Sequence, residues 1–209
     1  MASREFTLGS GDSLVASFAD EANLLAACRR GDQRAFGELV ARHERMVFGL
    51  AARLLGDAEE AQDLSQEVFL QVFRRLSRFR GQSALRTWIY RIVVNLCRNR
   101  HRFWNRRARD RSCALEDVTS TEQVKLSEPG VSSPYELARR AERSRWVQSA
   151  LLRLKFEHRL VLVLREIEGL SCQEIASATG VAIGTVKSRL ARGRDAFRVQ
   201  LERAEGRPE

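Results

Sequence analysis

Apolar side chains recur every three or four residues through most of this chain, which is the spacing of one face of an α-helix. Residues 23–55 follow this pattern in two blocks. The blocks are separated at Gly31 and Asp32, where a turn glycine precedes a residue type that caps helices. We therefore predict two helices. Their buried stripe would consist of Leu24, Leu25, Phe36, Leu39, Val40, Val47, Leu50 and Leu54.

Two further helices follow. The first begins at Asp57, whose carboxylate can accept hydrogen bonds from the free amides of the first turn, and it ends before Gly81. The second extends from about Ala84 to beyond Arg100. The inward positions would be Leu64, Val68, Val72, Phe73 and Leu76 in the first helix, and Leu85, Ile89, Ile92, Val93 and Leu96 in the second.

The periodic pattern stops between Asp110 and about Ser133, where Ser, Thr, Glu, Pro and Gly replace the apolar anchors. Such a segment buries too little apolar surface to offset the entropy of ordering it, so we predict a flexible linker. Helical periodicity then returns, and no strand alternation competes with it. We predict an all-α protein with a loose tail at 1–20, a first helical domain at 21–108, a linker at 109–137 and a second helical domain at 138–209.

The chain carries a surplus of positive charge. Its 36 Lys and Arg exceed its 27 Asp and Glu, which gives a net charge of +9 at pH 7 in 209 residues. A nucleic acid or an anionic membrane surface is therefore the first hypothesis for a partner. The longest apolar run, Leu160 to Leu164, is far shorter than the ~18–20 residues of a membrane-spanning helix, and the N-terminus has no signal-peptide pattern. We expect a cytoplasmic protein without membrane insertion.

The four cysteines are widely spaced and form no CxxC pair, which argues against a disulfide framework and against a four-ligand zinc site. Cys97 and His101 would share a helix face, but two ligands do not complete a metal site. The other histidines, His43 and His158, have no comparable neighbour. We expect reduced thiols, and no metal, cofactor or catalytic residue.

Seven arginines and a single aspartate occupy residues 98–111. No carboxylate lies on the basic stripe of the helix that leads into them, although a merely solvated face usually interleaves acids at i+4. Guanidinium planes and aromatic rings stack on unpaired bases, so this stripe favours contact with single-stranded or opened DNA. At 100° per residue the stripe consists of Trp88, Arg91, Asn95, Arg98 and Arg102.

A second basic cluster closes a helix-turn-helix pattern. Ser171 and Glu174 form a capping-box motif, Gly180 supplies the turn, and a second helix starts near Ile183 or Gly184. An ordinary amphipathic helix is the alternative. The inward side of this helix would consist of Val186, Leu190, Gly193 and Phe197. If the helix lay in the major groove, the side chains against base edges would be Lys187, Ser188, Ala191 and Arg192. Those nearer the phosphates would be Thr185, Arg189 and Arg194.

Residues 57–67, in contrast, contain five carboxylates and no basic side chain. The helix dipole favours acids in the first turn, but this does not account for Asp63 and Glu67. DNA would repel this face, so a basic protein partner is the more economical interpretation.

Four segments of the chain resemble the extracytoplasmic-function group of bacterial sigma-70-type factors, the subunits that give RNA polymerase its promoter specificity. They are residues 63–73 (DLSQEVFLQVF), 79–95 (FRGQSALRTWIYRIVVN), 159–171 (RLVLVLREIEGLS) and 184–194 (GTVKSRLARGR). Two positions depart from the family pattern. Residues 153–158 replace a proline-containing turn, and Cys172 stands where an aromatic is common.

The resemblance implies a promoter-melting domain followed by a helix-turn-helix domain, with core RNA polymerase and promoter DNA as partners. Family members often have an anti-sigma factor as well. The acidic helix would dock on the clamp coiled coil of the largest polymerase subunit through Asp63, Leu64, Gln66, Glu67, Leu70 and Phe73. The minus-ten element would contact Arg80, Gly81, Gln82, Ser83, Trp88, Arg91, Asn95 and Arg98, with a flipped base held by the loop and a neighbouring base by the asparagine. The minus-thirty-five element would contact Thr185, Lys187, Ser188, Arg189, Ala191, Arg192 and Arg194.

Two other functions fit parts of the sequence. A stand-alone helix-turn-helix regulator would share the second domain, but it leaves the acidic helix and residues 79–95 unexplained. A metal-dependent nuclease would need converging carboxylates, for which Asp63 and Glu67 are the candidates.

Overall fold

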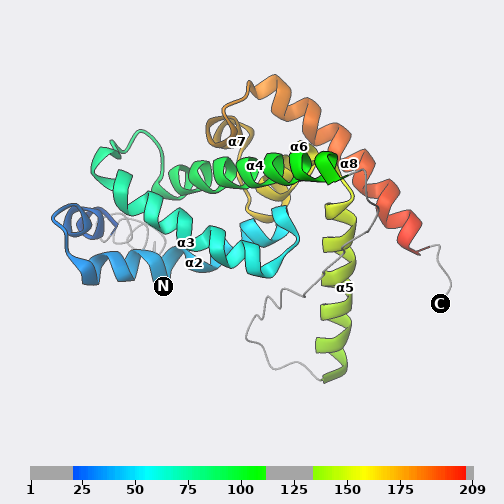
Figure 1. Ribbon diagram of the computed structural model, residues 1–209, viewed down its shortest axis with the longest axis horizontal. Helices are drawn as coiled ribbons and strands as arrows, with labels where there is room; N and C mark the ends of the chain where they lie inside the picture. Colours follow the sequence, from blue (N-terminus) through cyan, green and yellow to red (C-terminus); the bar gives the residue numbers. More distant parts are fainter. Residues whose placement is uncertain (1–20, 112–133, 206–209) are drawn as a thin grey trace, which may run out of the picture.

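The computed structural model describes residues 21–111 and 134–205, and within these ranges the chain forms helices and turns without strands (Figure 1). The predicted all-α class is confirmed. The predicted tail at residues 1–20 lies outside the described residues. In chain order the elements are a helical stretch at 21–29, α2 (Gln33–Leu55), α3 (Ala58–Arg75), the 3₁₀ turn η1 (Leu76–Arg78), α4 (Leu85–Arg111), α5 (Pro134–Leu152), α6 (Phe156–Leu162), the π-helical turn η2 (Val163–Ile167), α7 (Cys172–Thr179) and α8 (Ile183–Glu205).

The stretch at 21–29 and helices α2 to α4 form the first module, and α5 to α8 form the second. In the first module, hydrogen bonds from capping side chains fix where α2 and α3 begin. The Asp32 carboxylate accepts hydrogen bonds from the Arg34 and Ala35 amides at 2.9 and 3.2 Å. The Asp57 carboxylate accepts one from the Glu60 amide at 3.0 Å. Both starts were predicted from the sequence and are confirmed.

Helices α2, α3 and α4 pack around one apolar core. Leu39, Leu50, Leu64, Val68 and Ile89 are fully buried in it. Prediction of Phe73 as an inward residue was wrong, because its side chain is 60% exposed. It follows Val72 by one position, or 100° around the helix, and it makes a T-shaped contact with Phe36, with ring centroids 5.1 Å apart.

In the second module, α6 packs against α8, and α7 packs against α8 and η2. The start of α7 is a complete capping box, with the Ser171 hydroxyl accepting from the Glu174 amide at 3.2 Å and the Glu174 carboxylate accepting from the Ser171 amide at 2.8 Å. Gly180 ends α7 with a φ of 72°, as the turn requires. The predicted helix-turn-helix is confirmed, and α8 starts at Ile183.

Removing the capping box tests this part of the fold. Ser171→Ala is expected to lower the free energy of unfolding by about 1 kcal/mol, because the Glu174 amide loses its partner. Urea denaturation followed by circular dichroism measures the change. Ser144→Ala, at an exposed position of α5, is the matched control and should change stability little. Equal effects of the two substitutions would show that the cap contributes nothing.

The turn between α5 and α6 occupies residues 153–155. It lies in the segment where this sequence lacks the family's proline-containing turn. Arg159 is almost fully buried behind this turn. It donates a hydrogen bond to the Leu152 carbonyl at 3.3 Å and lies over the Phe156 ring. Burial lowers the pKa of Arg159 to about 10, so the side chain remains a cation that stabilises the end of α5.

The predicted linker was too long at both ends. Helix α4 continues to Arg111 and α5 begins at Pro134, so residues 109–111 and 134–137 are helical. Pro134 suits the first position of a helix because its missing N–H has no partner there. The central part of the predicted linker, residues 112–133, lies outside the described residues.

The two modules pack closely against each other, which the sequence did not predict. Helix α7 lies along α4, and α5 lies against α2 (Figure 1). Gly56 closes α2 with a φ of 82°, directly beneath Leu152 of α5. The Gln148 amide donates a hydrogen bond to the Ala52 carbonyl at 3.1 Å. The described part of the chain therefore forms one continuous core across both modules.

Candidate nucleic-acid and protein-binding surfaces

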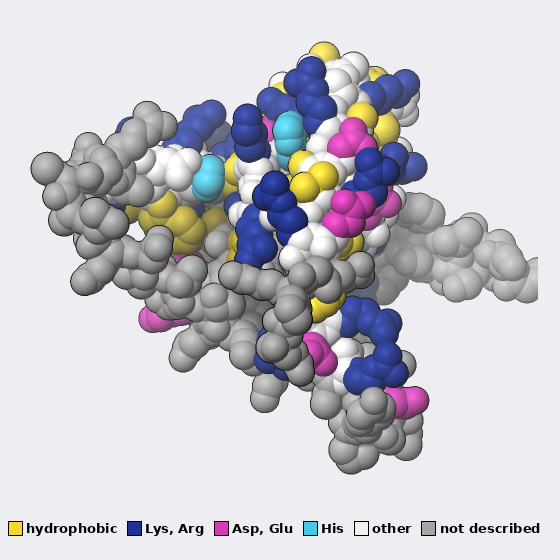
Figure 2. Space-filling view, turned by 90° about the vertical axis from the view of Figure 1, so that its right-hand side faces the viewer, with side chains coloured by type: hydrophobic (Ala, Val, Ile, Leu, Met, Phe, Trp, Pro, Cys, Tyr) yellow, Lys and Arg dark blue, Asp and Glu magenta, His cyan; other side chains and the backbone are white. Residues whose placement is uncertain are grey.

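The exposed face of α8 carries the residues predicted to read DNA bases. Lys187, Ser188, Ala191 and Arg192 are all exposed, whereas Val186, Leu190 and Gly193 are buried. A Cβ at Gly193 would meet Leu162 at 3.1 Å and the His158 carbonyl at 3.3 Å, so glycine permits α8 to lie close to α6. Figure 2 looks onto this side of the molecule and shows Lys and Arg side chains spread over it, with carboxylates between them.

The residues predicted to lie nearer the phosphates are partly engaged within the protein. The Arg194 guanidinium, at an exposed position, pairs with Glu166 at 2.6 Å. The half-buried Arg189 pairs with Glu157 at 2.5 Å. Thr185 is half-buried, and its carbonyl accepts a hydrogen bond from the Ser188 hydroxyl. Intramolecular carboxylates thus occupy positions where phosphates are expected.

The basic stripe of α4 does not face solvent as a whole, which corrects the prediction. Arg91, Asn95 and Arg102 are exposed, whereas Trp88 and Arg98 are half-buried. Helix α7 packs against α4, and its residues bond to two of the stripe's arginines. Arg91 donates hydrogen bonds to the Ser177 carbonyl and hydroxyl at 3.1 and 2.8 Å. Arg98 donates two hydrogen bonds to Glu157, at 3.1 and 2.9 Å, and one to the Thr179 carbonyl at 2.6 Å.

Trp88, at the start of this stripe, is half-buried and packs on Phe79, with ring centroids 5.2 Å apart. Beside it, the loop of Arg80, Gly81 and Gln82 is exposed, and Ser83 is half-buried. Gly81 has a φ of 71°. The Arg29 guanidinium donates to the Phe79 carbonyl at 2.5 Å and so anchors the start of the loop. The loop and Asn95 therefore remain open to solvent while Arg91 and Arg98 are engaged.

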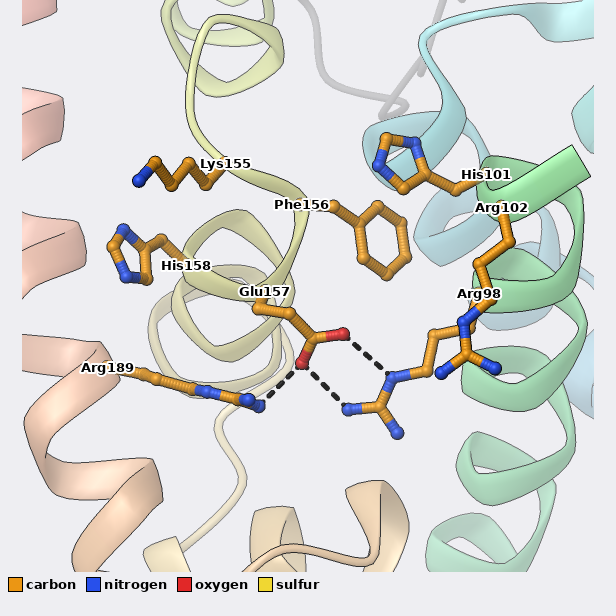
Figure 3. Close-up of a pocket in the computed structure, with 8 residues that line it drawn as sticks. All are labelled: Arg98, His101, Arg102, Lys155, Phe156, Glu157, His158 and Arg189. Atoms are coloured by element: carbon orange, nitrogen blue, oxygen red, sulfur yellow. Dashed lines mark hydrogen bonds and ion pairs between the residues drawn. The ribbon is translucent and has the colours of Figure 1, made fainter. Parts of the chain in front are cut away.

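A cavity of about 380 Å³ lies where α4, α6 and α8 meet. Figure 3 shows Glu157 projecting between the guanidiniums of Arg98 and Arg189. His101 stacks on Phe156, with ring centroids 4.5 Å apart. Burial lowers the pKa of His101, and the charge of Arg159 lowers it further, while the Glu157 carboxylate acts in the opposite direction. The cavity is lined by Arg98, His101, Arg102, Lys155, Phe156, Glu157, His158 and Arg189.

The acidic helix α3 presents a mixed face of carboxylates and apolar side chains. Asp63 and Gln66 are exposed, and the Glu67 carboxylate, 46% exposed, lies 3.8 Å from Arg100. Leu70 and Phe73 are 55% and 60% exposed and continue the same face. These side chains are brought together as predicted.

Leu64 is the exception on α3. Its side chain has no exposed surface and packs in the core of the first module. It cannot touch a partner, so its assignment to the partner-binding face was wrong. Leu64 lies one turn before Val68 on the inward stripe, and its role is to hold the helix in place.

Three residues that join the two modules were not predicted from the sequence: Glu157, Glu168 and Ser177. Each bonds to a basic or phenolic side chain of the other module, from 59 to 86 residues away along the chain. Their only sequence signal is weak. Glu157 is a carboxylate within the otherwise basic segment from Arg153 to Arg159.

None of the described helices is long and apolar enough to cross a membrane. Among the described residues, no group of three or more His, Cys, Asp and Glu side chains gathers closely enough to hold a metal ion.

Comparison with known proteins gives the family. A model of sigma-70 region 2 matches residues 39–108, and a model of sigma-70 region 4 matches residues 144–197. The RNA polymerase sigma-H factor of Pseudomonas aeruginosa is 37% identical over 86% of this chain and 92% of its own length. The ECF RNA polymerase sigma factor SigW of Bacillus subtilis is 34% identical over 83% of this chain and 92% of its own length.

A solved structure supports the fold. The sigma factor RpoE of Bartonella quintana, in complex with the anti-sigma factor NepR, superposes with a TM-score of 0.63, covering 80% of this chain and 96% of that chain at 21% identity. Both helical modules match the family, and the chain belongs to the sigma-70-type RNA polymerase sigma factors. Within that class it is a member of the extracytoplasmic-function subfamily. Membership favours a sigma factor over a stand-alone regulator, because the match includes region 2.

Proposed function

We propose that this protein binds core RNA polymerase through the exposed face of α3 and directs it to promoters through α8 and the α4 region. The observation that carries the proposal is the separation of charge. The exposed Asp63 lies on α3, where Arg100 of α4 pairs with the neighbouring Glu60 and Glu67. The exposed cations Lys187 and Arg192 lie on α8. A basic polymerase element and an anionic DNA are complementary to these two surfaces.

The polymerase contact is assigned to the clamp coiled coil of the largest subunit, as the family resemblance implies. Charge complementarity would guide the encounter, and the exposed apolar side chains of α3 would supply the buried centre of the interface. Leu64 is no longer among the contacts. The proposed contacts are Asp63, Gln66, Glu67, Leu70 and Phe73.

Promoter opening is assigned to the first module. Unstacking a base costs a few kcal/mol, so a pocket must compensate by holding the base that leaves the duplex. The loop at residues 80–83, exposed except at the half-buried Ser83, is proposed to hold that base, and the exposed Asn95 to contact its neighbour. Trp88, Arg91 and Arg98 would follow the opened strand along α4.

Run-off transcription tests the whole proposal. Core polymerase with this protein on a library of promoter fragments is expected to yield transcripts from a subset that shares minus-ten and minus-thirty-five sequences. Core polymerase alone is the control. Transcription that is unchanged by adding the protein would contradict the proposal.

Arg192→Ala tests the assignment of the minus-thirty-five contacts. Arg192 is exposed on the base-reading face of α8, and a bidentate base contact is worth ~1–3 kcal/mol of discrimination. We expect preference among minus-thirty-five variants to fall by this amount, measured by competition binding. Arg203→Ala removes the same charge near the end of α8 and should weaken binding without altering preference. Unchanged preference in the Arg192 variant would remove that residue from the base contacts.

Three finer points belong to this proposal. The protein is expected to act where the polymerase is, in the cytoplasm, and polymerase performs the chemistry. An anti-sigma factor is a further expected partner, and the fold neighbour from Bartonella quintana was solved with one.

Incubating the protein with magnesium and plasmid DNA checks the nuclease alternative. Cleavage abolished by changing Asp63 and Glu67 together would favour that alternative.

A further inference from the structure

The cavity where α4, α6 and α8 meet carries a surplus of positive charge. Its walls include a single carboxylate, Glu157, and four cations. The cations are Arg98, Arg102, Lys155 and Arg189. A hollow lined mainly by charges of one sign concentrates ions of the opposite sign, so this cavity attracts small anions.

The carboxylate of the cavity is already engaged within the protein. Arg98 donates two hydrogen bonds to Glu157, at 3.1 and 2.9 Å, and this fork fixes the carboxylate. Glu157 in turn accepts a hydrogen bond from Nη1 of Arg189 at 2.5 Å (Figure 3). Within the described part of the chain this is the only hydrogen bond of the Arg189 side chain, which leaves N–H groups for a ligand. Glu157 therefore positions Arg189 without occupying all of its donors.

Two further cations of the cavity have no acid beside them. Arg102 lies one turn after Arg98 on the same face of α4, and Lys155 lies in the turn before α6. Both are exposed. No carboxylate whose side chain the structure describes forms an ion pair with either of them. Their positive charges are therefore free to attract an external anion.

A fifth cation lies behind the wall of the cavity. Arg159 is only 5% exposed, and its guanidinium lies over the Phe156 ring, 5.6 Å from the centroid. The Nε atom of Arg159 has no hydrogen-bond partner, and no carboxylate of the described residues pairs with this side chain. Because the protein interior screens charge weakly, this cation would stabilise an anion bound in the cavity.

The size of the cavity and the residue types around it fit a small phosphate compound. Its volume of about 380 Å³ falls within the ~300–1,000 Å³ of pockets that hold small ligands. An arginine fork binds phosphate through two parallel N–H bonds, and a lysine binds it as a point charge. The stacked rings of His101 and Phe156 form an uncharged part of the wall.

We propose that this cavity binds a small anion with two adjacent phosphate groups, held by Arg102, Lys155 and Arg189. A single phosphate carries a charge of about −2, which is less than the surplus of four cations over one carboxylate. Two adjacent phosphates match that surplus better. The inference does not depend on the proposed function, because it concerns a small ligand and neither polymerase nor a promoter takes part.

Calorimetric titration of the full-length chain with sodium pyrophosphate, without magnesium and at fixed ionic strength, tests the site. We expect saturable binding of one pyrophosphate per chain. We also expect the melting temperature to rise with ligand concentration, because the ligand stabilises the native state that binds it. Sodium sulfate at the same ionic strength controls for general salt effects and should raise the melting temperature less.

Arg102→Ala combined with Lys155→Ala removes two of the three proposed ligand contacts. Both positions are exposed, and the Lys155 side chain makes no capping hydrogen bond, so the fold should be retained. We expect the affinity for pyrophosphate to fall at least about tenfold, the value of one charge-assisted hydrogen bond. The matched control, Arg45→Ala with Arg203→Ala, removes two charges from exposed positions outside the cavity. Because solvent ions screen distant charges, it should lower the affinity less than about twofold.

The histidines locate the ligand in the wild-type chain, so this measurement needs no variant. His101 and His158 line the cavity, whereas His43, the third histidine of the sequence, lies on α2 outside it. Pyrophosphate should shift the imidazole proton signals of the first two in NMR spectra and leave those of His43 unchanged. Equal shifts at all three histidines would show diffuse ion binding and contradict the proposal.

Titration with ADP separates two sources of the phosphate pair. Tighter binding of ADP than of pyrophosphate would support a nucleotide that also contacts the His101 and Phe156 side of the cavity. Weaker binding of ADP would support an inorganic diphosphate. The proposal is overturned if neither compound changes the melting temperature, or if the double variant binds them as tightly as the control variant does. If neither compound binds and the double variant loses affinity for random-sequence DNA, the cations serve the DNA backbone instead.

Discussion

Replacing Leu64 with alanine is expected to lower the free energy of unfolding by about 2–5 kcal/mol. The side chain is fully buried where α3 packs on α2 and α4, so its removal costs both the transfer energy of the lost atoms and a cavity. Urea denaturation followed by circular dichroism measures this change. Any loss of polymerase binding by the variant should follow the unfolded fraction.

Gln66→Ala is the matched control for this prediction. Gln66 is exposed on the same helix, two residues from Leu64, and its truncation should alter stability by less than about 0.5 kcal/mol. A Leu64 variant that is as stable as the Gln66 variant would show that α3 is not held by this core. It would also reopen Leu64 as a contact residue.

The parts of the fold that depend on short stretches of sequence were predictable. Asp32 and Asp57 cap amides two or three residues ahead, and Ser171 and Glu174 cap each other. The geometry of such a motif is determined locally, because the same turn of backbone positions both the donor and the acceptor. Helix starts, the turn at Gly180 and the inward stripes therefore followed from residue order.

The packing of the two modules was not predictable in the same way. Tyr90 and Glu168 are 78 residues apart, and nothing near either residue specifies the other. Polar residues on a helix surface look alike in sequence whether solvent or a second module covers them. Arg98 was therefore expected in solvent, although its side chain is only 14% exposed and bonds to Glu157 across the interface. Arg91 is exposed as expected, but it also bonds to Ser177 of the other module.

The errors at Leu64 and Phe73 have different causes. The resemblance assigned Leu64 to the partner-binding face, because a resemblance transfers a segment without separating its inward and outward faces. The apolar spacing placed Phe73 inward, although it follows Val72 by one position. Helical geometry separates them. Leu64 shares the inward line with Val68 and Val72, and Phe73 is turned 100° away from that line.

The second large effect is expected at the exposed apolar pair of α3. Leu70→Ala combined with Phe73→Ala should weaken binding to core polymerase about 30-fold, or ~2 kcal/mol, the threshold for a dominant interface contact. Large apolar side chains that are more than half exposed beside carboxylates suit the centre of such an interface. Fluorescence anisotropy of labelled protein titrated with core polymerase measures the affinity.

Stability separates this prediction from the first one. The double variant should lose no more than about 1.5 kcal/mol of folding free energy, because both side chains are more than half exposed and the Phe36–Phe73 pair is the aromatic contact that is removed. Val199→Ala, at an exposed apolar position on α8, should leave polymerase affinity unchanged. If the folded double variant binds polymerase like the wild type, the α3 face is not the docking surface. The carboxylates at Asp63 and Glu67 would then need another basic partner.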